Sequence, residues 1–321
     1  MEKGATGNGR AFFLPTKADI ATGTSGRHSV CMKQIGTMAA ISALLAPASI
    51  VRADTQKPSL KIGDEYEISK SYETSQQTDD GSSSGSSSGR DTILERVIAV
   101  RDAGLELEYD LPKDATAADR ARSWQFPARV FKPSHGQMQL LNHQQLDERL
   151  EGWLKAAKWT RAHCGRWIFT WNAFRIECDP QSVIKKIEAF DLSSADLRDG
   201  AEYRENGTRS AAALAKKTAG PNGATFAAMM EVDPDAVRRT RAESDVVVGE
   251  IMQKPVTLDA ALRARAKESI SGTISVTFET DSLGQAWRRT IVTKLKTKGQ
   301  NGQSEIESMK EETERKLVSV R

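Results

Sequence analysis

The sequence predicts an α+β protein with antiparallel β-meanders at both ends of the mature chain and helices packed on the sheet. Near the start, Tyr66, Ile68 and Tyr72 alternate with polar residues, which is typical of a strand with one buried and one wet face. Near the end, residues 274–279 alternate in the same way. The stretch between them contains apolar residues at helical spacing. We therefore expect the two meanders to form one curved sheet or half-barrel.

The two meanders share a short sequence. Residues 68–74 read ISKSYET and residues 274–280 read ISVTFET, and a second match joins RDTIL at 90–94 to RRTIV at 288–292. These matches indicate a duplicated meander, although unrelated exposed strands also place Ser, Thr and Glu at alternate positions. Under the duplication, the tract GSSSGSSSG at 81–89 is a flexible loop inserted into the first hairpin.

Residues 32–53, MKQIGTMAAISALLAPASIVRA, have the organisation of a secretory signal peptide: a basic start, an apolar core and small residues before a cut between Ala53 and Asp54. A buried core helix is the alternative, but Pro47 interrupts the apolar run. Residues 1–31 then represent either a misassigned start or a disordered leader.

Processing would remove the net positive charge of the chain. Six of the 46 basic residues but only two of the 43 acidic residues lie in residues 1–53, so the remainder is close to neutral. A nucleic-acid partner is therefore not expected. The remainder has no apolar run of the roughly 20 residues that a membrane span needs, so no transmembrane anchor is expected in the mature chain.

The mature chain divides into four predicted regions. They are an N-terminal β-meander region at 54–141, a helix, a disulfide hairpin and a short helix at 142–192, a variable or mobile segment at 193–230, and a helix pair with the C-terminal β-meander at 231–321.

Cys164 and Cys178 are the two cysteines of the mature chain, and an even number in an exported protein favours a disulfide. If residues 164–178 form a hairpin with a turn at 170–172, opposed residues have numbers that sum to 342, which places the two cysteines face to face. Two buried reduced thiols are the alternative.

Four tryptophans gather around this hairpin: Trp153, Trp159, Trp167 and Trp171. Such a cluster forms either an aromatic binding surface or the packing of a helix on a sheet. The histidines of the mature chain, His135, His143 and His163, lack the spacing of a metal site. The sequence shows no catalytic or cofactor motif, and neither a metal nor another cofactor is expected.

These features indicate an exported, non-catalytic protein of the bacterial envelope, periplasmic or secreted, that binds an apolar, lipid-like ligand or an envelope protein. An exported hydrolase with an unrecognised active site is the alternative.

Overall fold

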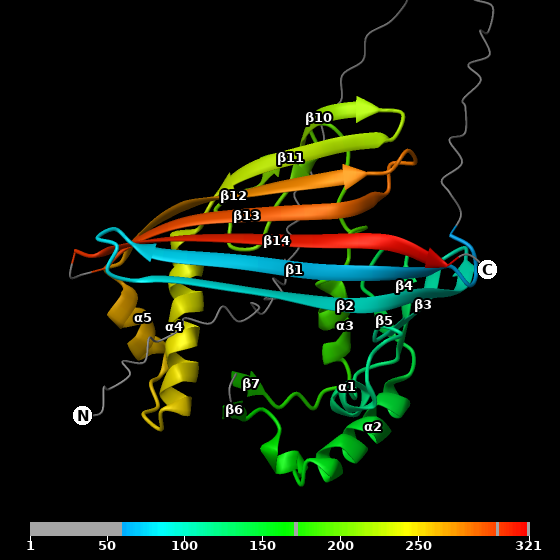
Figure 1. Ribbon diagram of the computed structural model, residues 1–321, viewed down its shortest axis with the longest axis horizontal. Coiled ribbons are helices and arrows are strands. Elements are labelled where there is room, and N and C mark those ends of the chain that lie inside the picture. The colour runs from blue at the N-terminus through cyan, green and yellow to red at the C-terminus, as the bar shows by residue number, and fades with distance from the viewer. Residues whose placement is uncertain (1–59, 170–172, 300–301, 320–321) are drawn as a thin grey trace, which may run out of the picture. The chain divides into compact units, whose positions relative to one another are not determined.

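Ten strands pair in one antiparallel sheet in the order β10-β11-β12-β13-β14-β1-β2-β3-β4-β5 (Figure 1). The computed structural model describes residues 60–169, 173–299 and 302–319. The sheet is open, with β10 and β5 at its edges, and five helices accompany it. The protein is therefore α+β, and its sheet does not close into a barrel.

The strands of the main sheet are β1 (Glu65–Thr78), β2 (Ser84–Arg101), β3 (Gly104–Asp110), β4 (Ala128–Pro133), β5 (Gln139–Leu140), β10 (Ala215–Gly220), β11 (Gly223–Glu231), β12 (Ser269–Thr280), β13 (Ala286–Lys298) and β14 (Ser304–Ser319). Two small hairpins are formed by β6 (Trp167–Phe169) with β7 (Ala173–Arg175) and by β8 (Glu202–Tyr203) with β9 (Ala212–Ala213). The helices are α1 (Ala117–Arg122), α2 (His143–Ala156), the 3-10 turn η1 (Arg161–His163), α3 (Ser182–Glu188), α4 (Pro234–Ile251) and α5 (Leu258–Arg265).

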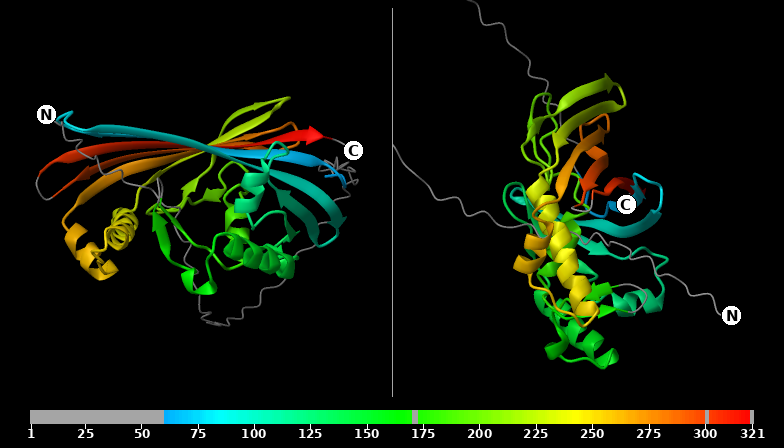
Figure 2. Two further views of the ribbon diagram at one scale, coloured as in Figure 1. Left: turned by 60° about the horizontal axis from the view of Figure 1, so that its bottom comes forward. Right: turned by 90° about the vertical axis from the view of Figure 1, so that its left-hand side faces the viewer.

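The last strand of the chain pairs with the first strand of the sheet at its centre. β14 lies between β13 and β1, with Ile68 opposite Arg315 and Thr74 opposite Met309. The two meanders therefore share one sheet. Helices α2 to α5 and the small hairpins lie on one side of this sheet, which we call its inner face (Figure 2).

Helices α2 and α3 cover the inner face over β1 to β4. Leu146, Leu150 and Leu154 recur at the spacing of one helix face, and all three are buried in α2. They pack in one core with Val183 and Ile187 of α3 and with strand residues that include Ile68, Ile93, Val97 and Val130.

A second, separate core covers the inner face of β11 to β13. Leu214, Phe226, Val276 and Phe278 are among its buried members. Helix α4 begins beside it, where the Asp233 side chain accepts a hydrogen bond from the backbone of Asp235 and thus caps the first turn.

The Ser/Gly tract does not form the predicted loop. The turn ends before Ser84, and residues 84–89 belong to β2, paired with β1. Ser and Gly have low strand propensity, but β1 offers an unbroken row of backbone partners, and pairing overrides the local preference. Residues 84–89 of the tract are therefore part of the sheet, and residues 81–83 lie in the turn.

The segment 193–230 was expected to be variable or mobile, and that expectation stays a prediction. The segment contains β8 and β9, and β10 and β11 belong to the main sheet. The alternating residues Phe226, Ala228 and Met230 of β11 are buried, because they lie on the inner face and pack in the second core.

The duplication of the meanders stays a prediction. The matched residues keep the same face, since Ile68 and Ile274 both point into cores. However, Ser71 pairs with Arg90 in the first hairpin, whereas Thr277 pairs with Thr290 in the second. In the sequence match Arg90 corresponds to Arg288, so the pairing of the second hairpin is shifted by two residues relative to that of the first.

The disulfide between Cys164 and Cys178 is confirmed, with the two Cα atoms 5.6 Å apart. The predicted register is present as well, because Trp167 pairs with Arg175. The signal peptide at 32–53, its cut between Ala53 and Asp54, the segment 1–31 and Trp171 lie outside the described residues.

Candidate functional site

Part of the inner face lies between the two cores and belongs to neither. We call it the inner-face strip. It consists of Tyr72, Thr74 and Gln76 of β1, Glu307, Met309 and Glu311 of β14, and Gly85, Ser87 and Gly89 of β2. These strands are positioned by their pairing at the centre of the sheet, so the strip has a rigid backbone.

The strip is only partly shielded from water. Tyr72 is 39% exposed, and the side chain of Glu311 opposite it is 25% exposed. On the outer face, Glu312 is exposed to a similar 30%. Because the side chains on the two faces are comparably accessible there, no helix among the described residues seals the Tyr72 end of the strip in the way that α2 and α3 seal the first core.

Small residues of β2 shape one side of the strip. Tyr72 lies opposite Gly89, and a Cβ atom on Gly89 would come 2.5 Å from the Tyr72 ring. The ring therefore lies across the bare backbone of β2. A Cβ on Gly85 would meet nothing within 4 Å, so the inner side of β2 is open there.

Charged groups border the strip. Lys70 forms an ion pair with Glu311 at 3.4 Å, and Arg241 of α4 forms one with Glu305 at 3.3 Å. Glu307 lies between these pairs, and its side chain forms no hydrogen bond or ion pair with another described residue. Burial raises the pKa of Glu307 to about 7, with Arg241 opposing and Glu305 adding to the rise. Glu307 is thus a carboxyl group that titrates near neutral pH.

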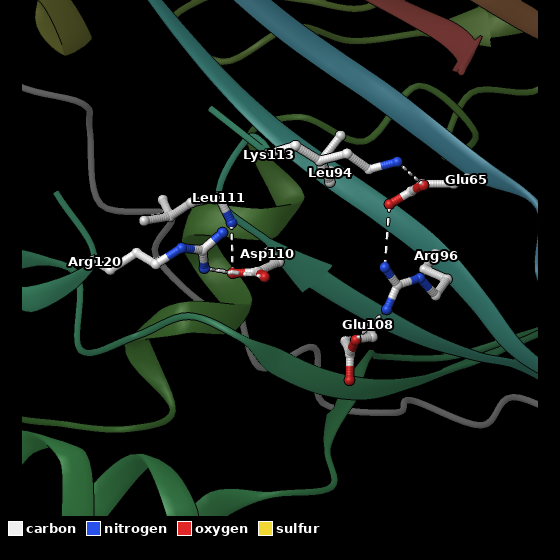
Figure 3. A pocket seen from close by; sticks show the side chains of 8 residues that line it. All are labelled: Glu65, Leu94, Arg96, Glu108, Asp110, Leu111, Lys113 and Arg120. Atoms are coloured by element: carbon white, nitrogen blue, oxygen red, sulfur yellow. Dashed lines mark hydrogen bonds and ion pairs between the residues drawn. The ribbon is translucent and has the colours of Figure 1, made fainter. Parts of the chain in front are cut away.

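A pocket of about 240 Å³ lies on the outer face, beside β1, β2 and β3 (Figure 3). Its floor includes the buried Glu65, which accepts hydrogen bonds from Lys113 at 2.6 Å and from Arg96 at 3.2 Å. Arg120 pairs with Asp110 at 2.9 Å. The lining carries three cations and three carboxylates: Arg96, Lys113, Arg120, Glu65, Glu108 and Asp110. Their charges cancel, so this pocket is a network of ion pairs that holds residues 110–120 on the sheet.

A second hollow of about 490 Å³ lies between the start of α4 and the end of α5. Its lining includes Asp233, Asp235, Arg238 and Arg239 with the apolar Leu262. Arg238 donates to the backbone oxygen of Glu268 at 3.0 Å, which ties α4 to the start of β12. The first pocket is lined largely by charged side chains, whereas the second hollow is open to solvent and combines charged side chains with apolar ones.

The predicted aromatic residues lie beside the first core. Trp153 of α2 and Trp159 contact each other edge to face, with ring centroids 5.3 Å apart, and both are half-buried against that core. Trp167 is half-buried in β6. The structure thus places these rings where they pack a helix, and their role as a binding surface stays a prediction.

The three histidines do not converge. His135 is exposed in the turn between β4 and β5, His143 begins α2, and His163 bonds locally to Thr160. None of them lines either pocket described above. Within residues 60–169, 173–299 and 302–319, no group of three or more His, Cys, Asp or Glu residues is placed to hold a metal ion.

No motif in the sequence marks Glu307, Met309 or Tyr72 as a site. The sequence feature that could have indicated this site is the alternation that places Glu307, Met309 and Glu311 on one face of a charged strand. That pattern becomes informative only when the pairing of β14 with β1 is known.

Comparisons with known proteins give little guidance. No family model matches the chain, and no curated protein matches it. A solved structure described as "Lipid-protein interactions in lipovitellin" aligns at 8% identity and a TM-score of 0.37, over 81% of this chain and 26% of the lipovitellin chain. An acyl-CoA thioesterase II from Mycobacterium marinum aligns at 10% identity and a TM-score of 0.11, over 79% of this chain and 82% of the thioesterase. The described part of the chain has no helix long and apolar enough to cross a membrane.

Proposed function

We propose that this is an exported, non-catalytic binding protein that holds a protein partner against the inner-face strip. One observation carries the proposal: the strip is an accessible stretch of sheet between two filled cores, and it bears the exposed ring of Tyr72. Tyrosine supplies a large contact area with few rotatable bonds, which suits protein interfaces.

A protein partner fits better than a lipid-like ligand. An apolar molecule needs an enclosed apolar cavity, whereas the first pocket is lined largely by charged side chains and the second hollow is open and carries four charged residues in its lining. The inner-face strip is open and mixed in polarity, as contact surfaces of non-obligate protein complexes are.

Export to an envelope or secreted location is part of the proposal. The disulfide between Cys164 and Cys178 supports it, because disulfides persist in oxidising compartments. N-terminal sequencing of protein from the producing cells should find Asp54 as the first residue. An intact Met1 would contradict export.

The binding proposal can be tested by site-specific photo-crosslinking in the producing cells. A photoreactive residue in place of Tyr72 should give an adduct with one protein of constant mass. The same residue in place of Lys294, which is exposed on the outer face, is the matched control and should give none. No adduct from Tyr72, or the same adducts from both positions, would contradict the proposal. The hydrolase alternative would instead require turnover that is lost when His135, His143 or His163 is replaced.

A further inference from the structure

We propose that the inner-face strip recognises a basic, amphipathic segment of its protein partner, with a Lys or Arg side chain of that segment pairing with Glu307. This inference rests on the function proposed above and specifies the chemistry of the partner.

The Glu307 carboxylate lacks a counter-charge in the free protein. Its cross-strand neighbours on the inner face are Gln76 of β1 and Leu295 of β13, and neither can neutralise it. Arg241 is the nearest cation, but it is shared between Glu305 at 3.3 Å and Glu268 at 3.7 Å. A cation brought by a partner would supply the missing interaction.

The other charged groups around Glu307 are already paired. Lys70 of β1 pairs with Glu311 of β14 at 3.4 Å, and Arg265 of α5 pairs with Glu268 at 2.8 Å and with Asp245 of α4 at 2.6 Å. The charged side chains nearest to Glu307 on the strip and on α4 are Lys70, Arg241, Glu268, Glu305 and Glu311. Together with Glu307 they carry four carboxylates and two cations. The surface is therefore complementary to a positively charged segment.

The strip also offers apolar contact at a suitable distance. Met309 follows Glu307 on the same face, and Tyr72 lies opposite Glu311. From Glu307 to Glu311 the strand advances four residues, which is about 13 Å. A segment of eight extended residues can therefore place a basic side chain at Glu307 and an apolar one at Tyr72. Methionine adapts its shape to such partners.

Pairing with a cation would couple binding to the protonation of Glu307. Burial raises the pKa of this carboxyl group to about 7 in the free protein. A nearby cation lowers the pKa of a carboxyl group, so binding should release a proton and become tighter as the pH rises through 7.

The test uses the full mature protein and two fluorescent eight-residue peptides of alternating sequence, one of Lys and Leu and the other of Glu and Leu. Fluorescence anisotropy at pH 6 and pH 8 gives the Kd of each peptide. We expect the Lys/Leu peptide to bind in preference, with an affinity that increases up to about tenfold from pH 6 to pH 8, because the fraction of ionised Glu307 rises about tenfold.

Two matched variants identify the group responsible. Glu307→Gln mimics the protonated form and should reduce the pH dependence to less than about twofold. Glu73→Gln removes a carboxylate from the outer face of the neighbouring strand β1 and should leave the tenfold change intact. Tyr72→Ala should weaken the Lys/Leu peptide at both pH values.

Equal affinity for the two peptides, no binding of the Lys/Leu peptide, or full pH dependence in Glu307→Gln would overturn this inference. If the crosslink at Tyr72 still captures one protein in that case, the proposed function stands and only the basic character of its partner is wrong. An absent crosslink at Tyr72 overturns the proposed function itself.

Discussion

A buried ion pair joins the last strand of the chain to β2, and replacing its cation should destabilise the protein strongly. Arg315 donates to Glu95 at 2.6 Å and 3.1 Å, and Glu95 is only 7% exposed. Tyr109 donates its hydroxyl hydrogen to the second oxygen of Glu95 at 2.7 Å. The guanidinium of Arg315 also lies over the ring of Tyr66, 3.3 Å from its centroid. We consider the change Arg315→Met, which keeps most of the apolar stem.

The expected loss in the free energy of unfolding is about 3–5 kcal/mol, because the change leaves the Glu95 carboxylate buried without a counter-charge. Tyr109 cannot compensate by itself. Burial and the Glu95 carboxylate hold the pKa of Tyr109 well above its ordinary value, so its hydroxyl already donates one neutral hydrogen bond.

Urea denaturation at pH 7, followed by circular dichroism, measures this loss. Arg288→Met is the matched control, since Arg288 pairs with Glu279 at 3.3 Å but is 30% exposed on the outer face, and its loss should be within about 1 kcal/mol. The double variant Glu95→Gln with Arg315→Met should recover part of the stability, because no buried charge remains. A loss for Arg315→Met no larger than that for Arg288→Met would refute this reasoning.

Three further changes test the strip and the hairpin. Because the pKa of Glu307 rises from 4.5 to about 7 on folding, its ionisation destabilises the fold increasingly from pH 4.5 to 7, and the cost is fully present above 7. Glu307→Gln should therefore raise the free energy of unfolding at pH 8 by about 1–3 kcal/mol, discounted for partial exposure, and leave it unchanged at pH 4, as urea titrations at both pH values will show. Cys164→Ser should lower stability by about 3 kcal/mol in the same assay, and equal stability of the oxidised wild type and the variant would contradict a structural role for the bridge. Gly89→Ala should cost about 1–3 kcal/mol by displacing the Tyr72 ring, whereas Gly85→Ala, which meets nothing, should change stability by less than about 0.5 kcal/mol.

Local patterns were enough to predict the strands and the disulfide. The alternation around Ile68 and around Ile274 depends on the two-residue period of a strand, which is visible in any short window. The bridge between Cys164 and Cys178 followed from a hairpin register within fifteen residues. In both cases the interacting residues are close in sequence, so the geometry of a single strand or turn contains the information.

The strands formed by residues of low strand propensity could not be predicted from local patterns. The tract at 84–89 has the composition of a loop, and it becomes a strand because β1 supplies backbone partners along its length. Strand β11, in the segment 193–230, likewise depends on its pairing with β12 and on the packing of its side chains in the second core. Their structure depends on partners that the local sequence does not identify.

Residue patterns were enough to predict an α+β protein, strands with one apolar and one polar face, and a bridge between Cys164 and Cys178. The pairing of β14 with β1, a contact across more than two hundred residues of chain, could be seen only in the folded protein. That pairing places Gln76 beside Glu307, while the β13–β14 hairpin places Leu295 on its other side, and neither neighbour supplies a counter-charge. The physical reason is that strand alternation fixes which face a side chain occupies, whereas the partner strand fixes which charges it meets.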